Sequence, residues 1–176
     1  MKLITDFIYK SECYYQKSGV KNVLRVLLTD GSTAMILYRL TYYLQRIRLG
    51  IIGHVFAMIN KYLNGCIIGR KAQFDEGFVL MHPVGVVING AVKGGKYICI
   101  ESGVVIGAAR NGLPVEVPTI GSRVLIGSGA KVLGNIVIGN NVTIGANAVV
   151  TKDVPHGATV VGIPARIVKI DGREVG

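Results

Sequence analysis

The chain has 176 residues, half of them apolar and 17% charged, and this composition excludes an intrinsically disordered protein. The net charge of +10 suits an anionic partner such as a phosphorylated cofactor, a membrane surface or nucleic acid. Nucleic acid is not expected, because no zinc-finger spacing, RNA-binding motif or arginine cluster with interleaved aromatics is found. Three widely spaced cysteines and the lack of a recognisable signal-peptide pattern favour the cytoplasm.

Residues 1–65 are predicted to form a helical region. Apolar residues recur at three- and four-residue steps between positions 37 and 47, after a run of N-cap residues at 30–33. A second, short helix is expected at about 51–63, and one earlier helix between residues 3 and 28.

A basic and aromatic surface is expected on these helices. Its residues are Tyr38, Arg39, Tyr42, Tyr43, Arg46 and Arg48. They either pack the helices against the rest of the chain or make a peripheral contact with the inner face of a membrane.

From residue 66 to 176 the apolar period becomes six. The residues at this spacing, the core ladder, are Ile68, Phe74, Leu80, Val86, Val92, Ile98, Val104, Ile120, Ile126, Val132, Ile138, Ile144 and Val150. A period of six suits a three-sided prism with one short strand per side and about 4.8 Å between coils. The sequence therefore predicts a mainly β protein, a parallel β-helix with an N-terminal α-helical region. Residues 110–119 interrupt the ladder and should protrude as a loop.

Residues 65–169 resemble the hexapeptide-repeat acyltransferases, and within them the serine acetyltransferase branch. The resemblance is carried by residues 81–88 (MHPVGVVI), 120–135 (IGSRVLIGSGAKVLGN) and 161–168 (VGIPARIV). It implies a left-handed β-helix and an enzyme that uses acetyl-CoA as co-substrate.

The resemblance also implies site residues. His82 is the general base, because an imidazole can remove a proton from a hydroxyl at neutral pH. Backbone N–H groups at Gly107 and Ala108 are candidates for stabilising the thioester oxygen, or they form an ordinary corner. The residues implied in CoA binding are Gly127, Ser128, Gly129, Ala130, Lys131, Asn135, Lys152, Arg166 and Lys169. No catalytic metal is expected, because the three histidines lack the spacing of a zinc site.

Three departures from the serine acetyltransferase pattern concern the acceptor. That branch has Asp directly before the catalytic His, where this chain has Met81, and an orienting Asp where it has Ile67. Its Arg-His pair is replaced by residues 116–117, Glu-Val. No acidic partner for His82 is evident; Glu101, one coil away, is a weak candidate, and a backbone carbonyl is the alternative.

These departures lead to the prediction of an acetyl-CoA-dependent O-acetyltransferase that acts on a sugar hydroxyl. The length and layout are similar to the colanic acid type O-acetyltransferases of surface polysaccharide biosynthesis, so a small or lipid-linked sugar is the expected acceptor. The alternatives are a serine O-acetyltransferase of cysteine biosynthesis and a non-catalytic β-helix scaffold. A homotrimer is expected in each case, because the flat prism faces need covering.

Overall fold

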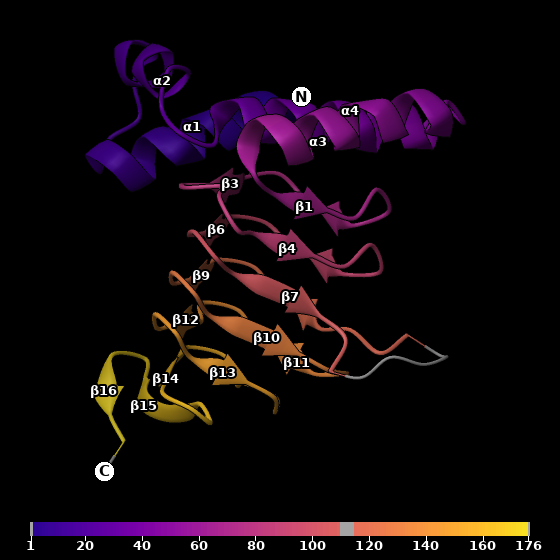
Figure 1. Ribbon diagram of the computed structural model, residues 1–176. Helices are drawn as coiled ribbons and strands as arrows, with labels where there is room; N and C mark the ends of the chain where they lie inside the picture. Colours follow the sequence, from indigo (N-terminus) through magenta and orange to yellow (C-terminus); the bar gives the residue numbers. More distant parts are fainter. Residues whose placement is uncertain (1, 110–114, 176) are drawn as a thin grey trace.

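The computed structural model describes residues 2–109 and 115–175, in which a layer of helices lies across one end of a β prism (Figure 1). The helices are α1 (Lys2–Tyr15), α2 (Val20–Val26), α3 (Ser32–Arg46) and α4 (Gly50–Asn64). The helices expected in this region are present, but the single helix expected between residues 3 and 28 is two helices, α1 and α2. None of the described helices is long and apolar enough to cross a membrane.

Short strands follow in a regular order around the prism. They are β1 (Ile67–Ile68), β2 (Gln73–Phe74), β3 (Phe78–Leu80), β4 (Val87–Ile88), β5 (Lys93–Gly94), β6 (Ile98–Ile100), β7 (Val105–Gly107), β8 (Thr119–Ile120), β9 (Val124–Ile126), β10 (Lys131–Leu133), β11 (Val137–Ile138), β12 (Thr143–Ile144), β13 (Val149–Val150), β14 (Ala158–Val161), β15 (Arg166–Ile170) and β16 (Arg173–Glu174).

Three sheets form the sides of the prism. Their strand orders are β1-β4-β7-β10-β13, β2-β5-β8-β11 and β3-β6-β9-β12-β14-β15-β16. Neighbouring strands come from successive coils and run parallel, for example with Val87 opposite Val105. Among the described strands, the antiparallel pairs are β14–β15 and β15–β16, which close the C-terminal end of the third sheet. This is the parallel β-helix that the sequence predicts.

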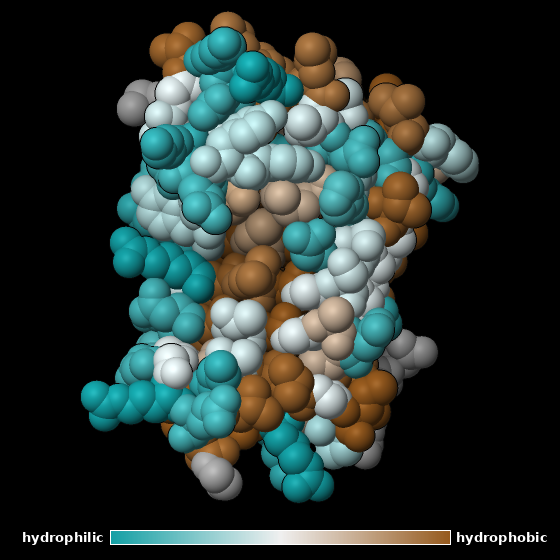
Figure 2. All heavy atoms as spheres, turned by 90° about the vertical axis from the view of Figure 1, so that its left-hand side faces the viewer, coloured by the Kyte–Doolittle hydropathy of each residue, from teal (hydrophilic) through white to brown (hydrophobic). Residues whose placement is uncertain are grey.

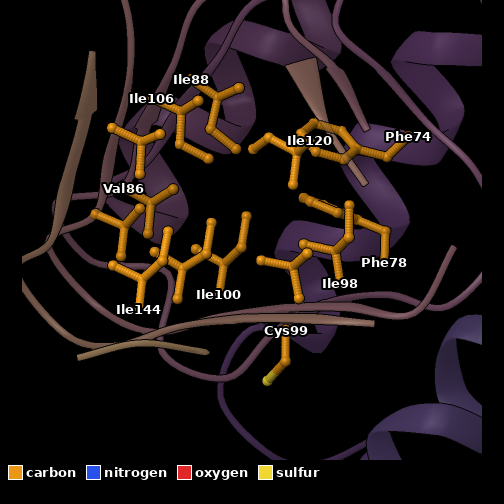
Figure 3. Packing of buried hydrophobic residues seen from close by; sticks show 14 of the residues in the cluster. Phe74, Phe78, Val86, Ile88, Ile98, Cys99, Ile100, Ile106, Ile120 and Ile144 are labelled. Atoms are coloured by element: carbon orange, nitrogen blue, oxygen red, sulfur yellow. The ribbon is translucent and has the colours of Figure 1, made fainter. Parts of the chain in front are cut away.

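The core runs through the interior of the prism. Every residue of the core ladder is buried, and the most exposed of them, Ile68, keeps 8% of its surface accessible. Figure 3 shows ladder residues from different coils, such as Ile98 and Ile120, pointing into the same interior, while Cys99 points out of the wall. The six-residue period is therefore the repeat of inward-facing side chains.

The protruding loop expected at 110–119 lies partly outside the described residues, which exclude 110–114. On its C-terminal side, β8 pairs with both β5 and β11. The four-stranded sheet therefore resumes its regular stacking after the interruption.

A buried ion pair joins the helices to the first coil. Arg39 of α3 and Asp6 of α1 have fully buried side chains, and Arg39 Nε lies 2.6 Å from Asp6 Oδ2. Asp6 Oδ1 also accepts hydrogen bonds from the backbone N–H groups of Gly77 and Phe78, at 2.8 and 2.9 Å. Arg39 Nη1 donates to the carbonyl oxygen of Phe74 at 2.8 Å. The pair therefore satisfies main-chain groups at the end of the prism that would otherwise lack partners.

The burial of Tyr38 and Arg39 contradicts part of the prediction of a basic and aromatic surface. Tyr38 is 2% exposed and Arg39 is fully buried, and both face the prism. The Tyr38 hydroxyl donates to the carbonyl oxygen of Ala72 and accepts from the N–H of Phe74. These two residues pack the helices on the prism and are not available to a membrane.

Replacing Asp6 by Asn is expected to reduce the free energy of unfolding by about 3–5 kcal/mol, because Arg39 is left as a buried charge without its counter-ion. The control is Lys2→Met, which removes the partly exposed pair between Lys2 of α1 and Asp75 of the first coil and should cost less than about 1 kcal/mol. Denaturant unfolding of both variants measures the difference. Equal losses would contradict the special role of the buried pair.

Candidate active site

His82 lies in an enlarged corner between two sheets. Six residues, 81–86, connect β3 to β4, whereas four residues, 101–104, connect β6 to β7 in the next coil. Later coils repeat the four-residue connection at 127–130 and 145–148.

The extra residues of this corner are His82 and Pro83. The N–H of Met81 donates to the carbonyl oxygen of Ile100, and the N–H of Gly103 donates to that of Val84. The coil-to-coil ladder is therefore regular on both sides of His82 and Pro83. This local insertion lets the imidazole leave the wall, and the His82 side chain is 51% exposed.

The acidic partner of His82 comes from the helical region. Asp30 Oδ2 lies 3.3 Å from His82 Nδ1, across 52 positions of sequence. Asp30 belongs to the α2–α3 link, residues 27–31, and its side chain is 75% exposed. With Nδ1 held by a carboxylate, Nε2 is left to exchange a proton with a reactant.

The sequence reads Asp30 as a candidate helix cap, and this role is not observed. The N-cap residue of α3 is Gly31, in the left-handed region with φ 78°, and no side chain caps the helix. A Cβ at Gly31 would come within 2.0 Å of the carbonyl oxygen of Leu80. The glycine therefore allows the α2–α3 link to lie directly against the end of β3, which brings Asp30 to His82.

The other acidic and imidazole groups do not join this pair. His82 Nδ1 contacts Asp30 and not Glu101, which lies on the following coil. His156 Nδ1 accepts the N–H of Asn140 at 2.8 Å in a corner of the last coils. Among the described residues, no group of three or more histidines, cysteines and carboxylates is arranged to hold a metal ion.

The predicted CoA-binding coil at 127–131 stacks two coils below His82 on the same edge of the prism. Packing between coils explains its glycines: a Cβ at Gly127 would lie 2.8 Å from the nitrogen of Ala146, and one at Gly129 would lie 2.1 Å from Asn147 Oδ1. Ser128 is exposed, and Ala130 is buried in the core. Lys131 Nζ donates to the carbonyl oxygens of Gly103 and Gly129, at 2.7 and 2.8 Å. Its charge is therefore held by the wall.

The remaining predicted residues lie on the opposite edge of the five-stranded sheet. Gly107 ends β7 and leads through Ala108 into the interruption, and Asn135 is an exposed residue between β10 and β11. Among the described residues, a Cβ at Gly107 would meet only Asn89 Cβ, at an ordinary 3.5 Å, so packing against them does not require this glycine.

Two predicted cationic residues come together near the end of the prism. Lys152 and Arg166 line one groove of about 360 Å³, with Thr151, Pro164 and Ala165 between them. Lys169 lies further along β15, where its Nζ is 3.9 Å from Glu174 Oε1. The structure thus brings together two of the four cations predicted to bind CoA. The other two, Lys131 and Lys169, contact the prism wall and Glu174.

Comparison with known proteins agrees with this arrangement. The family model described as bacterial transferase hexapeptide (six repeats) matches residues 118–152. A serine acetyltransferase of Synechococcus elongatus is 39% identical over 158 residues, which cover 89% of this chain and 65% of the relative. One from Helicobacter pylori strain J99 is 37% identical over 168 residues, covering 94% of this chain and 98% of the relative.

Solved structures agree as well. The crystal structure of serine acetyltransferase in complex with coenzyme A from Brucella abortus has a TM-score of 0.84 and 28% identity, covering 98% of this chain and 68% of that one. This chain therefore spans about two thirds of the longer relatives and nearly all of the shorter one. The fold is the left-handed parallel β-helix that the resemblance implies.

The expected sugar acceptor is a wrong prediction. The strong relatives are serine acetyltransferases, and the closeness to colanic acid type enzymes is not shown. The prediction treated the missing Asp at position 67 as a missing partner for the histidine, although Asp30 supplies a carboxylate from the helical region. The 37% identity over almost the full length of a relative places the chain in the serine acetyltransferase family of hexapeptide-repeat proteins, which are acetyl-CoA-dependent acyltransferases.

Proposed function

We propose that this protein transfers an acetyl group from acetyl-CoA to the hydroxyl of L-serine, with His82 as the general base. The contact between His82 Nδ1 and Asp30 Oδ2 carries the proposal, because it pairs an exposed imidazole with a carboxylate at the enlarged corner. The serine hydroxyl attacks the thioester carbonyl as His82 Nε2 takes its proton. The imidazolium then returns the proton to the departing CoA sulfur, giving O-acetylserine and CoA.

The oxyanion of the tetrahedral intermediate is assigned to the backbone at Gly107 and Ala108 of a neighbouring subunit, because within one chain these residues lie on the opposite edge of the five-stranded sheet from His82. The support is that packing among the described residues does not require a glycine at 107, in contrast to Gly127. A small residue there leaves room for the thioester against the backbone, and N–H groups are effective donors to a developing negative charge.

The CoA phosphates are assigned to Lys152 and Arg166. Both side chains face the same groove, and cations hold phosphate oxygens by charge-assisted hydrogen bonds. Gly127, Ser128, Gly129 and Asn135 are assigned to the pantetheine arm, along the five-stranded sheet that joins the two edges of the site. Ala130, which is buried in the core, is not assigned to the arm.

Steady-state kinetics with L-serine test the acceptor and the base together. The wild type should release CoA with a specificity constant for L-serine of about 10⁴ M⁻¹s⁻¹ or more, as is usual for enzymes. The kcat of His82→Ala should be lower by a factor of about 10²–10⁴, because the positioned base is absent. Asp30→Asn should lower kcat by up to about fivefold, since exposed charge pairs contribute about 0–1 kcal/mol.

Glu101→Gln is the matched control for Asp30→Asn, because it neutralises the neighbouring carboxylate that does not contact His82. It should keep the wild-type kcat. The proposal fails if the rate of CoA release does not depend on L-serine but depends on another hydroxyl compound. It also fails if His82→Ala keeps more than about a tenth of the activity.

The cofactor assignment predicts a change in KM with little change in kcat. Lys152→Ala and Arg166→Ala should each raise the KM for acetyl-CoA by a factor of about 10 to 150, since a hydrogen bond to a charged group contributes about 1.5–3 kcal/mol. The effect should be smaller with acetyl-dephospho-CoA, which lacks one phosphate. Arg173→Ala removes an exposed cation of the neighbouring β16 and serves as the control. A normal KM in both groove variants would place the phosphates elsewhere.

The active unit is proposed to be a homotrimer. Apolar side chains remain exposed on the prism walls, among them Val84, Val87, Leu125 and Val137. Figure 2 shows a strip of apolar surface bordered by polar side chains on the face of the seven-stranded sheet. Packing around a threefold axis would cover such surface and place clefts between subunits. Analytical ultracentrifugation should give three times the chain mass of 18.8 kDa; a stable monomer at micromolar concentration would contradict the trimer.

A further inference from the structure

A buried lysine lies behind the α2–α3 link. Lys10 of α1 has no exposed surface, although an isolated ammonium group is costly to bury. Its Nζ donates to the carbonyl oxygen of Asp30 and, at 2.8 Å, to the Ser32 hydroxyl. Ser32 in turn donates to the carbonyl oxygen of Val26. One ammonium group therefore ties together the end of α2, the link and the start of α3.

The pKa of Lys10 depends on its burial and on the groups close to its ammonium. Burial lowers its pKa from 10.5 to about 8, and the charge of Asp30 is the main opposing influence. The Tyr14 ring of the same helix lies 5.9 Å from Nζ. At neutral pH the group is therefore still mostly protonated, and Asp30 is the carboxylate that faces it.

Asp30 is consequently held at two atoms by different parts of the chain. Its main-chain carbonyl accepts from Lys10, while its carboxylate lies against His82. On the other side, Gly31 is in close contact with the backbone of Leu80 and Met81, just before His82. The link is thus held between α1 and the end of β3, which leads into the corner that carries His82.

We propose that Lys10 is a positioning residue for acetyl transfer, whose buried ammonium fixes the main chain of Asp30 so that the Asp30 carboxylate holds His82 in its reactive orientation. This rests on the proposed function in one respect, that His82 is the base. Lys10 itself touches neither substrate nor cofactor, and its effect passes through Asp30.

A double-mutant cycle tests the coupling. Lys10→Met keeps the length of the side chain and removes its donors, and it should lower kcat by about the same factor as Asp30→Asn, with the KM for acetyl-CoA unchanged. The double variant should be no slower than either single variant, because both act through one contact. Lys2→Met is the matched control: it removes another lysine of α1 that bonds to the first coil, at Phe74 and Asp75, and it should leave kcat unchanged.

The ring nitrogens of His82 give a readout that a merely structural role would not move. In the neutral imidazole, ¹⁵N chemical shifts report which nitrogen carries the proton. The wild type should hold it on Nδ1, facing Asp30. Lys10→Met and Asp30→Asn should both move protons to Nε2, and Lys2→Met should not. Lys10→Gln, which cannot reach both acceptors, replaces Lys10→Met if circular dichroism shows that the latter does not fold.

The outcomes separate the two proposals. The role of Lys10 would be overturned if the kcat of the double variant fell by the product of the two single losses. It would also be overturned if a folded Lys10 variant kept the wild-type kcat and the proton on Nδ1. Full activity in His82→Ala would instead overturn the general base, and with it the proposed function.

Discussion

The buried pair of Asp6 and Arg39 is the contact on which the arrangement of this molecule depends. A parallel β-helix has an open edge at its first coil, where main-chain groups have no neighbouring coil to bond. Asp6 accepts from two N–H groups of this edge, and Arg39 donates to its carbonyl oxygens. Because the two residues belong to α1 and α3, the same pair fixes the helix that carries Lys10 and the helix that follows the link bearing Asp30.

The prism was predictable because its cause is local and repeated. Thirteen apolar residues, spaced six apart from Ile68 to Val104 and again from Ile120 to Val150, indicate which side chains face inward, and all of them are buried. The helices followed from ordinary amphipathic spacing. The interaction between the two parts was less accessible: Arg39 reads as an exposed basic residue, and nothing in its neighbourhood reveals that Asp6, 33 positions away, neutralises it.

Only part of the site could be predicted from the sequence, for the same reason. His82 lies in a recognisable coil, but its partner Asp30 reads as a helix cap in a different region. Comparing positions 67, 81 and 116–117 with a family pattern tests whether a residue type is present at one place, whereas a carboxylate can reach the same point from another segment. The predicted CoA cations show the converse: Lys131 fits the pattern, yet its ammonium group is occupied by two carbonyl oxygens of the wall.

The enlarged corner at residues 81–86 has a consequence for how such proteins change over time. The two additional residues sit between coil-to-coil hydrogen bonds that keep their register on both sides. The number of residues in this corner can therefore change without altering the stacking of the strands. The free-energy cost of an insertion is confined to the loop itself. A corner of a solenoid can gain or lose residues and reshape the place where an acceptor meets the histidine, while the wall assigned to the cofactor stays as it was.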